Sequence, residues 1–423
     1  MLLKIRGIGK INDSTIEMKG ITVIAGENNT GKSTFGKVLY CMFNAFCNID
    51  ATVLNERIVG IHDTISQGLL FNEFNTIRLS NKLMEQILNL KNDFTAEKFR
   101  ELMINSSGKI DKEDIRLLDY AIQISIDRIK QYVIIGDMEI KKNIINRYFN
   151  SEFFRQINHV NRPDVSGEVL LIIEGKNVRV NFSGNECSDF DDEVGLIHDA
   201  TYIDTPFILD DIGASRNMKE KYYYNKAGLI NHKDNLFYRM VKETESAIIT
   251  EAIAKQKLNN VLSIINCMAE GDFTETNNFL SFTTHSMKQP IALQNLSAGM
   301  KILLIIKRLL EQGEINERDV LIFDEPEIHL HPDWQIKFAK ILILLQKEFD
   351  LTILLTTHSP YFLNAIEVFS KKYNAQKECK FYLAKSDCDV SDVDDVTNDI
   401  DEVYQQMALP FQKLDDIAYA DDK

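Results

Sequence analysis

One short segment near the amino end has the residue types and spacing that bind a phosphate chain. Residues 26–33 read GENNTGKS, fit the pattern GxxxxGK[ST], and lie between a predicted strand and a predicted helix. In such a P-loop, backbone N–H groups and the helix N-terminus surround the phosphates, Lys32 neutralises the β and γ phosphates, and Ser33 is a ligand of Mg²⁺. This context disfavours an ordinary glycine turn, so we expect a site for ATP and Mg²⁺. The residues expected to bind the nucleotide are Gly26, Asn28, Asn29, Thr30, Gly31, Lys32, Ser33 and Thr34.

Two adjacent carboxylates follow the apolar run VLIF at residues 320–323. Asp324 and Glu325 are therefore expected at the carboxyl end of a buried strand, where α/β sheets bind ligands. Asp324 is suited to hold the hydration shell of Mg²⁺, and Glu325 is suited to activate the attacking water as a general base. A helix N-cap is the alternative use of two adjacent acids, but the apolar run before them and Pro326 after them disfavour it.

Two further motifs are weaker when each is taken alone. LTILLTTHSP predicts another strand that ends at His358, which can hydrogen-bond a γ-phosphate, although a histidine there is more often an ordinary structural residue. LSAGMK places Ser297, Ala298 and Gly299 at the start of an apolar helix whose N-terminus can bind an anion, although an ordinary N-cap explains it as well. The expected catalytic residues are Lys32, Glu325 and His358, and the expected metal ligands are Ser33 and Asp324.

The elements that must position these residues come from two separated parts of the chain. Short β-rich runs precede the P-loop, and a helix–strand alternation typical of a parallel α/β sheet surrounds the two carboxylates. Between them lies a region with apolar residues at helical spacing, interrupted by helix breakers. The expected divisions are 1–47 and 271–385 for the two parts of the head, 48–165 for a helical insertion, 166–215 for return strands, 216–270 for a helical segment, and 386–423 for an acidic tail with a short docking helix.

Several local features carry their own expectations. Gly175 and Lys176 separate two apolar runs as the turn of a hairpin, and SFTTHSMKQPIAL predicts another hairpin. Residues 385–402 are rich in Asp, which favours a solvated stretch over a set of metal ligands. EVYQQMALPFQKLDDI after it predicts a short amphipathic helix that docks on the body or on a partner.

Composition limits the classes of function. The 423 residues are 44% hydrophobic and 26% charged, and their formal net charge of -15 opposes broad attraction to a nucleic-acid backbone. The six cysteines lack metal-ligand spacing, which favours reduced thiols. No apolar run is long enough to span a bilayer and no signal segment is evident, so we expect a cytoplasmic protein without a membrane partner.

In the order GENNTGKS, LSAGMK, LIFDEPEIHLHP and TTHS, the motifs resemble those of the ABC-like ATPases of the structural-maintenance-of-chromosomes (SMC), RecF and OLD groups. Glu327, His329, His331 and Pro332 look like the OLD branch in particular. The resemblance covers residues 1–45 and 280–385, and it implies an α/β, ABC-type P-loop ATPase head with an inserted, mainly helical lobe. It also implies a head-to-head homodimer, able to stack into higher oligomers, in which Ser297 and Gly299 of one chain close over ATP held by the other.

This sequence departs from the OLD pattern in two ways. Only about 65 residues follow His358, too few for the C-terminal Toprim nuclease domain of OLD proteins, so the resemblance implies no nuclease activity of its own. No clear Q-loop glutamine is present either. Asp204 or Thr205, in TYIDTPFILDD, is the expected substitute for it.

Standalone ATPases of this kind are similar to components of bacterial antiphage systems, such as PtuA of Septu and the ATPases that accompany retrons. The leading hypothesis is an ATPase that serves as sensor and scaffold for a separate effector, for example a nuclease of HNH type or a toxin. Slow hydrolysis would be compatible with this role. The alternative is an SMC- or RecF-like repair ATPase that binds DNA directly, with EIKKNIINR and RNMKEKYYYNK as its basic surface. A transporter cassette is disfavoured by the helical insertion and by HLHP, and a P-loop kinase is disfavoured by LSAGMK and by the strand that ends at His358.

Overall fold

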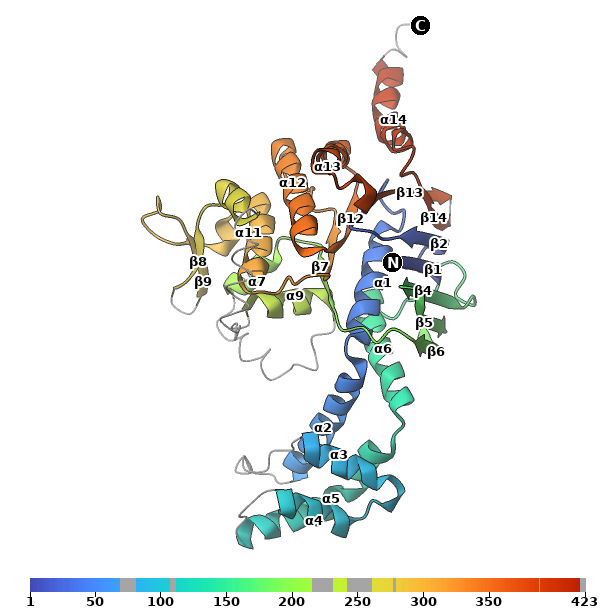
Figure 1. The fold of residues 1–423 in the computed structure, drawn as a ribbon, viewed down its shortest axis with the longest axis vertical. Helices are drawn as coiled ribbons and strands as arrows, with labels where there is room; N and C mark the ends of the chain where they lie inside the picture. The colour runs from blue at the N-terminus through green and yellow to red at the C-terminus, as the bar shows by residue number, and fades with distance from the viewer. Residues whose placement is uncertain are drawn as a thin grey trace. The chain divides into compact units, whose positions relative to one another are not determined.

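The structure is a computed structural model that describes residues 1–68, 81–106, 112–214, 231–241, 261–276, 279–387 and 389–418. It divides into two compact units, Met1–Cys47 with Ile145–Lys423, and Asn48–Ile144 (Figure 1). None of the described helices combines the length and the apolarity needed to cross a bilayer.

The first unit is built on one large sheet. Its order in the described residues is β6-β5-β4-β1-β2-β14-β13-β3-β12-β11-β7, and β13, β3, β12, β11 and β7 run parallel to their neighbours in that part of the sheet. This arrangement confirms the predicted α/β class. The strands are β1 (Leu2–Ile8), β2 (Ile11–Glu17), β3 (Ile21–Gly26), β4 (Gly167–Ile173), β5 (Lys176–Ser183), β6 (Glu186–Asp192), β7 (Ala200–Ile203), β11 (Val320–Asp324), β12 (Thr352–Thr357), β13 (Cys379–Asp387) and β14 (Val390–Asp395).

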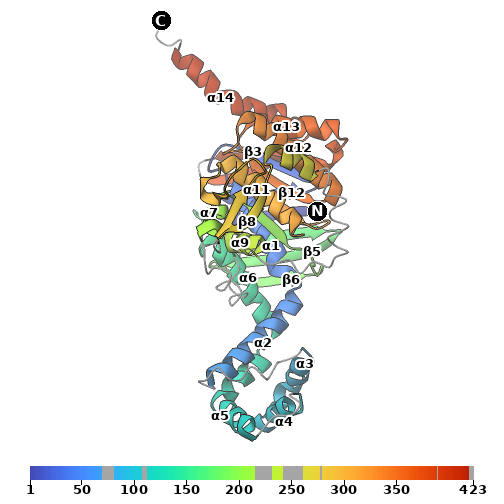
Figure 2. The ribbon, with the colours of Figure 1, turned by 90° about the vertical axis from the view of Figure 1, so that its left-hand side faces the viewer.

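Helices cover both faces of the parallel part, as expected for strands that are apolar on both sides. Val23, Leu321 and Leu355 face one core together with residues of α11, α12 and α13. On the other face, a Cβ added to Gly36 of α1 would lie 3.0 Å from Ile322 Cγ2, so α1 packs closely there. Figures 1 and 2 both show α12 beside α13. The helices are α1 (Lys32–Phe46), α7 (Ile208–Ala214), α9 (His232–Val241), α11 (Ala298–Glu311), α12 (Pro332–Phe349), α13 (Pro360–Lys372) and α14 (Asp401–Ala418).

The second unit is helical and has its own core. Ile61, Phe99 and Ile129 are fully buried in it. The unit ends at Ile144, earlier than the expected boundary at 165, because the rest of α6 packs in the first unit. There the ring centroids of Phe149 and Phe182 are 4.6 Å apart. Its helices are α2 (Ile49–Gly68), α3 (Asn81–Leu90), α4 (Ala96–Ser106), α5 (Lys112–Ile134) and the first part of α6 (Asp137–Phe153).

The structure corrects the expectation for the Asp-rich stretch after Lys385. It is not a solvated tail over its whole length, because β14 pairs with β13 and joins the large sheet. The strand tolerates its carboxylates because neighbours bind them: Asp392 Oδ1 accepts the Asp13 N–H at 3.1 Å, and Asp394 lies 2.8 Å from Lys385 Nζ. α14 follows, where an amphipathic helix was predicted.

The first predicted hairpin is shifted by one residue. Glu174 and Gly175 form the turn with φ of 51° and 81°, and Lys176 already belongs to β5. Two consecutive positive φ values are typical of the tight turns that match strand twist. In the second hairpin region, β9 (Phe279–Thr283) pairs antiparallel with both β8 (Asp272–Thr276) and β10 (Ile291–Ala292).

The helical segment expected at 216–270 lies partly outside the described residues. Its described parts are helical over α9 and over 261–268. The basic run RNMKEKYYYNK, at 216–226, also lies outside them.

Candidate functional site

The P-loop joins the end of β3 to the start of α1, as predicted. Gly26 has φ of 152° and Gly31 has φ of 79°, a range that disfavours other residues. An added Cβ would lie 2.6 Å from the Ala384 carbonyl oxygen at Gly26 and 2.8 Å from Ile11 Cδ1 at Gly31. The loop therefore needs glycine at both positions to pass so close to β13 and β2.

The remaining predicted P-loop residues lie around this bend. Thr30 is buried, and its hydroxyl donates to the Glu27 carbonyl oxygen at 2.8 Å, while the Thr34 N–H donates to the Gly31 carbonyl oxygen at 3.0 Å. Asn28 and Asn29 are exposed, and Asn29 has φ of 67°. Ser33 is half-buried in the first turn of α1.

Lys32 lies buried inside the loop. Its Nζ donates to the carbonyl oxygens of Gly26 at 3.0 Å and Glu27 at 2.7 Å, and lies 3.3 Å from Glu325 Oε1. The side chain is only 4% exposed. The three donors of this buried ammonium face two carbonyls and one carboxylate, so an anion that enters the loop can replace some of these contacts.

Glu325 connects Lys32 with His358. Its Oε1 faces Lys32, and its Oε2 lies 3.5 Å from His358 Nδ1. The backbone holds Glu325 in place because its N–H donates to Thr356 Oγ1 at 3.0 Å and its φ is 48°. The structure thus brings the three predicted catalytic side chains together at the carboxyl ends of neighbouring strands.

Asp324 is fixed from both flanking strands. Thr356 of β12 donates its hydroxyl to Oδ1, and Tyr202 of β7 donates its hydroxyl to Oδ2 at 2.9 Å. Carboxylate and hydroxyl oxygens are the ligands that Mg²⁺ prefers, so Asp324 and Ser33 fit this metal. The narrow glycine cradle and the buried Lys32 fit the phosphates of ATP.

Glu327 is a buried acid without an assigned role in the sequence analysis. Its Oε1 accepts the Thr357 hydroxyl at 2.5 Å and the His358 N–H at 3.1 Å, so it ties the start of the DEPEIHLHP loop to the end of β12. Oε2 is buried and has no hydrogen-bond partner among the residues that the structure describes. Burial raises the pKa of this carboxyl above its ordinary value, although the bonds to Thr357 and His358 oppose the rise.

Because Oε1 accepts both of the bonds that Glu327 receives from the described side chains and backbone, the amide of Glu327→Gln can replace the acid. We expect Glu327→Gln to change the free energy of unfolding by less than about 1 kcal/mol, whereas Glu327→Ala lowers it by about 1–3 kcal/mol by leaving buried donors unsatisfied. Urea unfolding of the three proteins checks this. Equal losses for both variants would contradict the assigned bonding.

The predicted anion-binding residues of LSAGMK, which are Ser297, Ala298 and Gly299, lie at the start of α11. Ser297 caps the helix by accepting the Met300 N–H at 3.3 Å, Ala298 is the first helical residue, and Gly299 follows it. A Cβ added to Gly299 would lie 3.2 Å from Leu330 Cδ2 and 3.3 Å from the His329 carbonyl oxygen. The helix start therefore packs directly on the DEPEIHLHP loop, and Ser297 is also an ordinary N-cap within its own chain.

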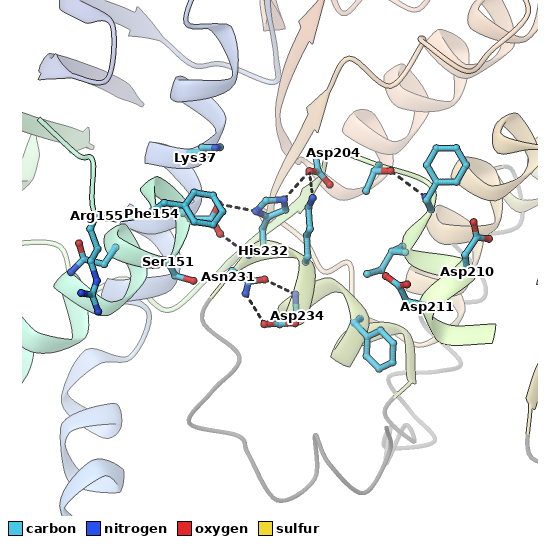
Figure 3. A pocket seen from close by; sticks show the side chains of 17 residues that line it. Lys37, Ser151, Phe154, Arg155, Asp204, Asp210, Asp211, Asn231, His232 and Asp234 are labelled. Atoms are coloured by element: carbon cyan, nitrogen blue, oxygen red, sulfur yellow. Dashed lines mark hydrogen bonds and ion pairs between the residues drawn. The ribbon is translucent and has the colours of Figure 1, made fainter. Parts of the chain in front are cut away.

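A pocket of about 960 Å³ lies beside β7 (Figure 3). The sequence pointed to only some of the residues that line it. Asp204 and Thr205, the expected substitutes for a Q-loop glutamine, line it, and that role stays a prediction. His232 of α9, absent from the predicted residues, lines it as well. Its Nδ1 lies 2.7 Å from Glu152 Oε2, and its Nε2 lies 3.1 Å from Asp204 Oδ2.

The two carboxylates keep His232 charged. Burial lowers the pKa of the ring, but Asp204 and Glu152 outweigh it and raise the pKa to about 9. The folded-state pKa therefore exceeds the ordinary value, so the stabilisation is complete below about pH 6.5 and is lost as the pH rises through about 9.

We expect the free energy of unfolding to fall by about 3 kcal/mol more in the wild type than in His232→Gln between pH 6.5 and about 9.5, as measured by urea titrations. His62→Gln, which changes an exposed ring, is the matched control and keeps the wild-type pH dependence. Identical pH profiles for wild type and His232→Gln would show that the contacts of His232 with Glu152 and Asp204 do not stabilise the fold.

A family model described as "AAA domain, putative AbiEii toxin, Type IV TA system" matches residues 21–364. The matched range contains the P-loop, LSAGMK, Asp324, Glu325 and His358. Among curated proteins, the chain is similar to the "Retron Vc95 probable ATPase" of Vibrio cholerae serotype O1 biovar El Tor. The two are 23% identical over 393 residues, which cover 87% of this chain and 71% of that protein.

Among solved structures, the chain is similar to an Smc head bound to the C-winged helix domain of ScpA, with 12% identity and a TM-score of 0.44. This match covers 93% of this chain and 96% of that one. It is also similar to an SMC head domain from Thermotoga maritima, with 11% identity, a TM-score of 0.40, and coverage of 93% of this chain and 98% of that one.

Proposed function

The chain belongs to the AAA-domain family whose model spans residues 21–364, and on that premise we propose that it is an ATP hydrolase acting as sensor and scaffold for a separate effector in antiphage defence. The observation that carries the hydrolase part is the position of Glu325, with one carboxylate oxygen toward Lys32 and the other toward His358. The sensor and scaffold part is supported by the similarity to a protein named as a retron ATPase.

Within the site, each side chain has a distinct task. Lys32 exchanges its contacts with loop carbonyls and Glu325 for phosphate oxygens, which frees the Glu325 carboxylate to orient and deprotonate a water. His358 hydrogen-bonds the terminal phosphate and so reports its presence. Asp324 and Ser33 hold Mg²⁺, which when bound neutralises charge on the phosphates.

The active site is completed by a second copy of the chain. Ser297 and Gly299 start α11, whose free N–H groups and dipole suit an anion, and the resemblance to ABC-like ATPases assigns that anion to the partner's nucleotide. In this arrangement bound ATP joins two subunits and hydrolysis releases them, so nucleotide state sets assembly state. A sensor needs such a link between the nucleotide that is bound and the assembly that the effector meets.

The DNA-binding alternative has less support from the described residues. In the basic run EIKKNIINR, Lys141 Nζ lies 2.6 Å from Asp50 Oδ1, so part of its charge is already neutralised within the helical unit. The net charge of -15 also opposes duplex binding.

Co-expression of the tagged chain with its genomic neighbours, followed by affinity purification and mass determination with and without ATP and Mg²⁺, tests the proposal. We expect a stable complex with a nuclease, of HNH type for example, or with a toxin. A protein that is recovered alone and binds duplex DNA with steep salt dependence in ATP would instead support the repair alternative.

A further inference from the structure

We propose that Tyr202 is a positioning residue for the carboxylate of Asp324, and that His232 positions Tyr202 from the neighbouring pocket. The inference rests on the proposed use of Asp324 in holding Mg²⁺. It assigns a task to two buried side chains for which the sequence predicted no role.

The phenol of Tyr202 fixes one oxygen of Asp324. Tyr202 is paired with Ile322 in the parallel register of β7 and β11, and its hydroxyl donates to Asp324 Oδ2 at 2.9 Å. Tyr202 is 1% exposed, so water does not compete for this bond. With Thr356 on Oδ1, this bond sets the plane of the carboxylate and thus the direction of its remaining lone pairs.

Tyr202 also contacts the helix that carries Lys32 and Ser33. A Cβ added to Gly36 of α1 would lie 3.3 Å from both Cζ and the hydroxyl oxygen of Tyr202. The phenol therefore lies between α1 and Asp324, the two parts of the site that would hold the metal. A change in the tilt of the phenol would shift the carboxylate of Asp324 relative to Ser33.

His232 fixes the other side of the phenol ring. The two rings stack with centroids 4.4 Å apart and an interplanar angle of 28°. His232 is itself held by two carboxylates. Its backbone N–H donates to Glu152 Oε1 at 2.6 Å, its ring Nδ1 bonds to Glu152 Oε2, and its ring Nε2 faces Asp204. Figure 3 shows the clamped ring at the pocket, between Asp204 and the α6 side. The continuous chain of contacts is Glu152, His232, Tyr202 and Asp324.

The test is Tyr202→Phe in the full-length protein, which removes one hydroxyl and keeps the ring that fills the space. Mn²⁺ prefers the same oxygen ligands as Mg²⁺ and reports binding by electron paramagnetic resonance. We expect Tyr202→Phe to weaken Mn²⁺ binding to the complex with a non-hydrolysable ATP analogue about 10-fold, with analogue affinity in EDTA unchanged. Tyr148→Phe, a ring of the same aromatic cluster, keeps the wild-type Mn²⁺ affinity.

The role of His232 follows from a double-mutant cycle. His232→Gln weakens Mn²⁺ binding when Tyr202 is present, and adds nothing in the Tyr202→Phe background if it acts through the phenol. Wild-type Mn²⁺ affinity in Tyr202→Phe, with metal-dependent nucleotide binding intact, would overturn the positioning proposal alone. Absence of metal-dependent binding in the wild type would overturn the proposed function, and this inference with it.

Discussion

Glu325→Gln is expected to lower kcat of ATP hydrolysis about 1000-fold while ATP still binds, because the amide cannot take a proton from the attacking water. The substitution keeps the shape of the side chain and an oxygen for the neighbouring donors. Its loss of negative charge beside Lys32 also leaves that ammonium more available to the phosphates. Steady-state phosphate release and titration with a fluorescent ATP analogue measure the two effects.

Asp350→Asn is the matched control for this variant. Asp350 is another acid with positive φ, at 50° against 48° for Glu325, but it lies exposed at the C-cap of α12. Its amide variant should hydrolyse ATP at the wild-type rate. If Glu325→Gln retained more than about a tenth of the wild-type kcat, a different group would have to be the base.

Lys32→Ala should weaken ATP binding at least about 100-fold. The lost contacts are charge-assisted hydrogen bonds to phosphate oxygens, which contribute together about 3 kcal/mol or more. The fold should tolerate the change, because the bonds lost within the protein go only to two loop carbonyls and to Glu325. Equilibrium titration with the fluorescent analogue checks the affinity.

Lys340→Ala, which removes a lysine from α12, is the control and should bind ATP normally. Tight ATP binding by Lys32→Ala would mean that the nucleotide binds somewhere other than the glycine loop.

Sequence alone predicted the parts of the site that lie on regular strands. The runs ITVIAG, VLIF and ILLT are apolar apart from Thr22 and Thr356, and strands of this kind are buried on both faces in a parallel sheet, as these are. Since the carboxyl ends of such strands meet at one sheet edge, the neighbourhood of Lys32, Glu325 and His358 followed from their places after these runs.

The features that sequence missed depend on partners far along the chain. Tyr202 reads as one more apolar residue of a short strand, and only the pairing of β7 with β11 shows that its hydroxyl meets Asp324. His232 has no motif around it, and its two carboxylates come from α6 and from the end of β7. The Asp-rich β14 looked solvated because local composition does not show that Lys385 and the backbone of Asp13 bind its side chains.

In the proposed dimer, two copies of the chain form each ATP site, with Lys32 from one copy and Ser297 from the other. Mixing Lys32→Ala protein with Ser297→Arg protein, each inactive alone, tests it most directly, because a mixed dimer contains one site with both native elements. We expect ATP hydrolysis to reappear on mixing, together with particles of twice the 48.6 kDa chain mass in the presence of ATP. A mixture no more active than its separate components, although the two variants associate, would contradict it.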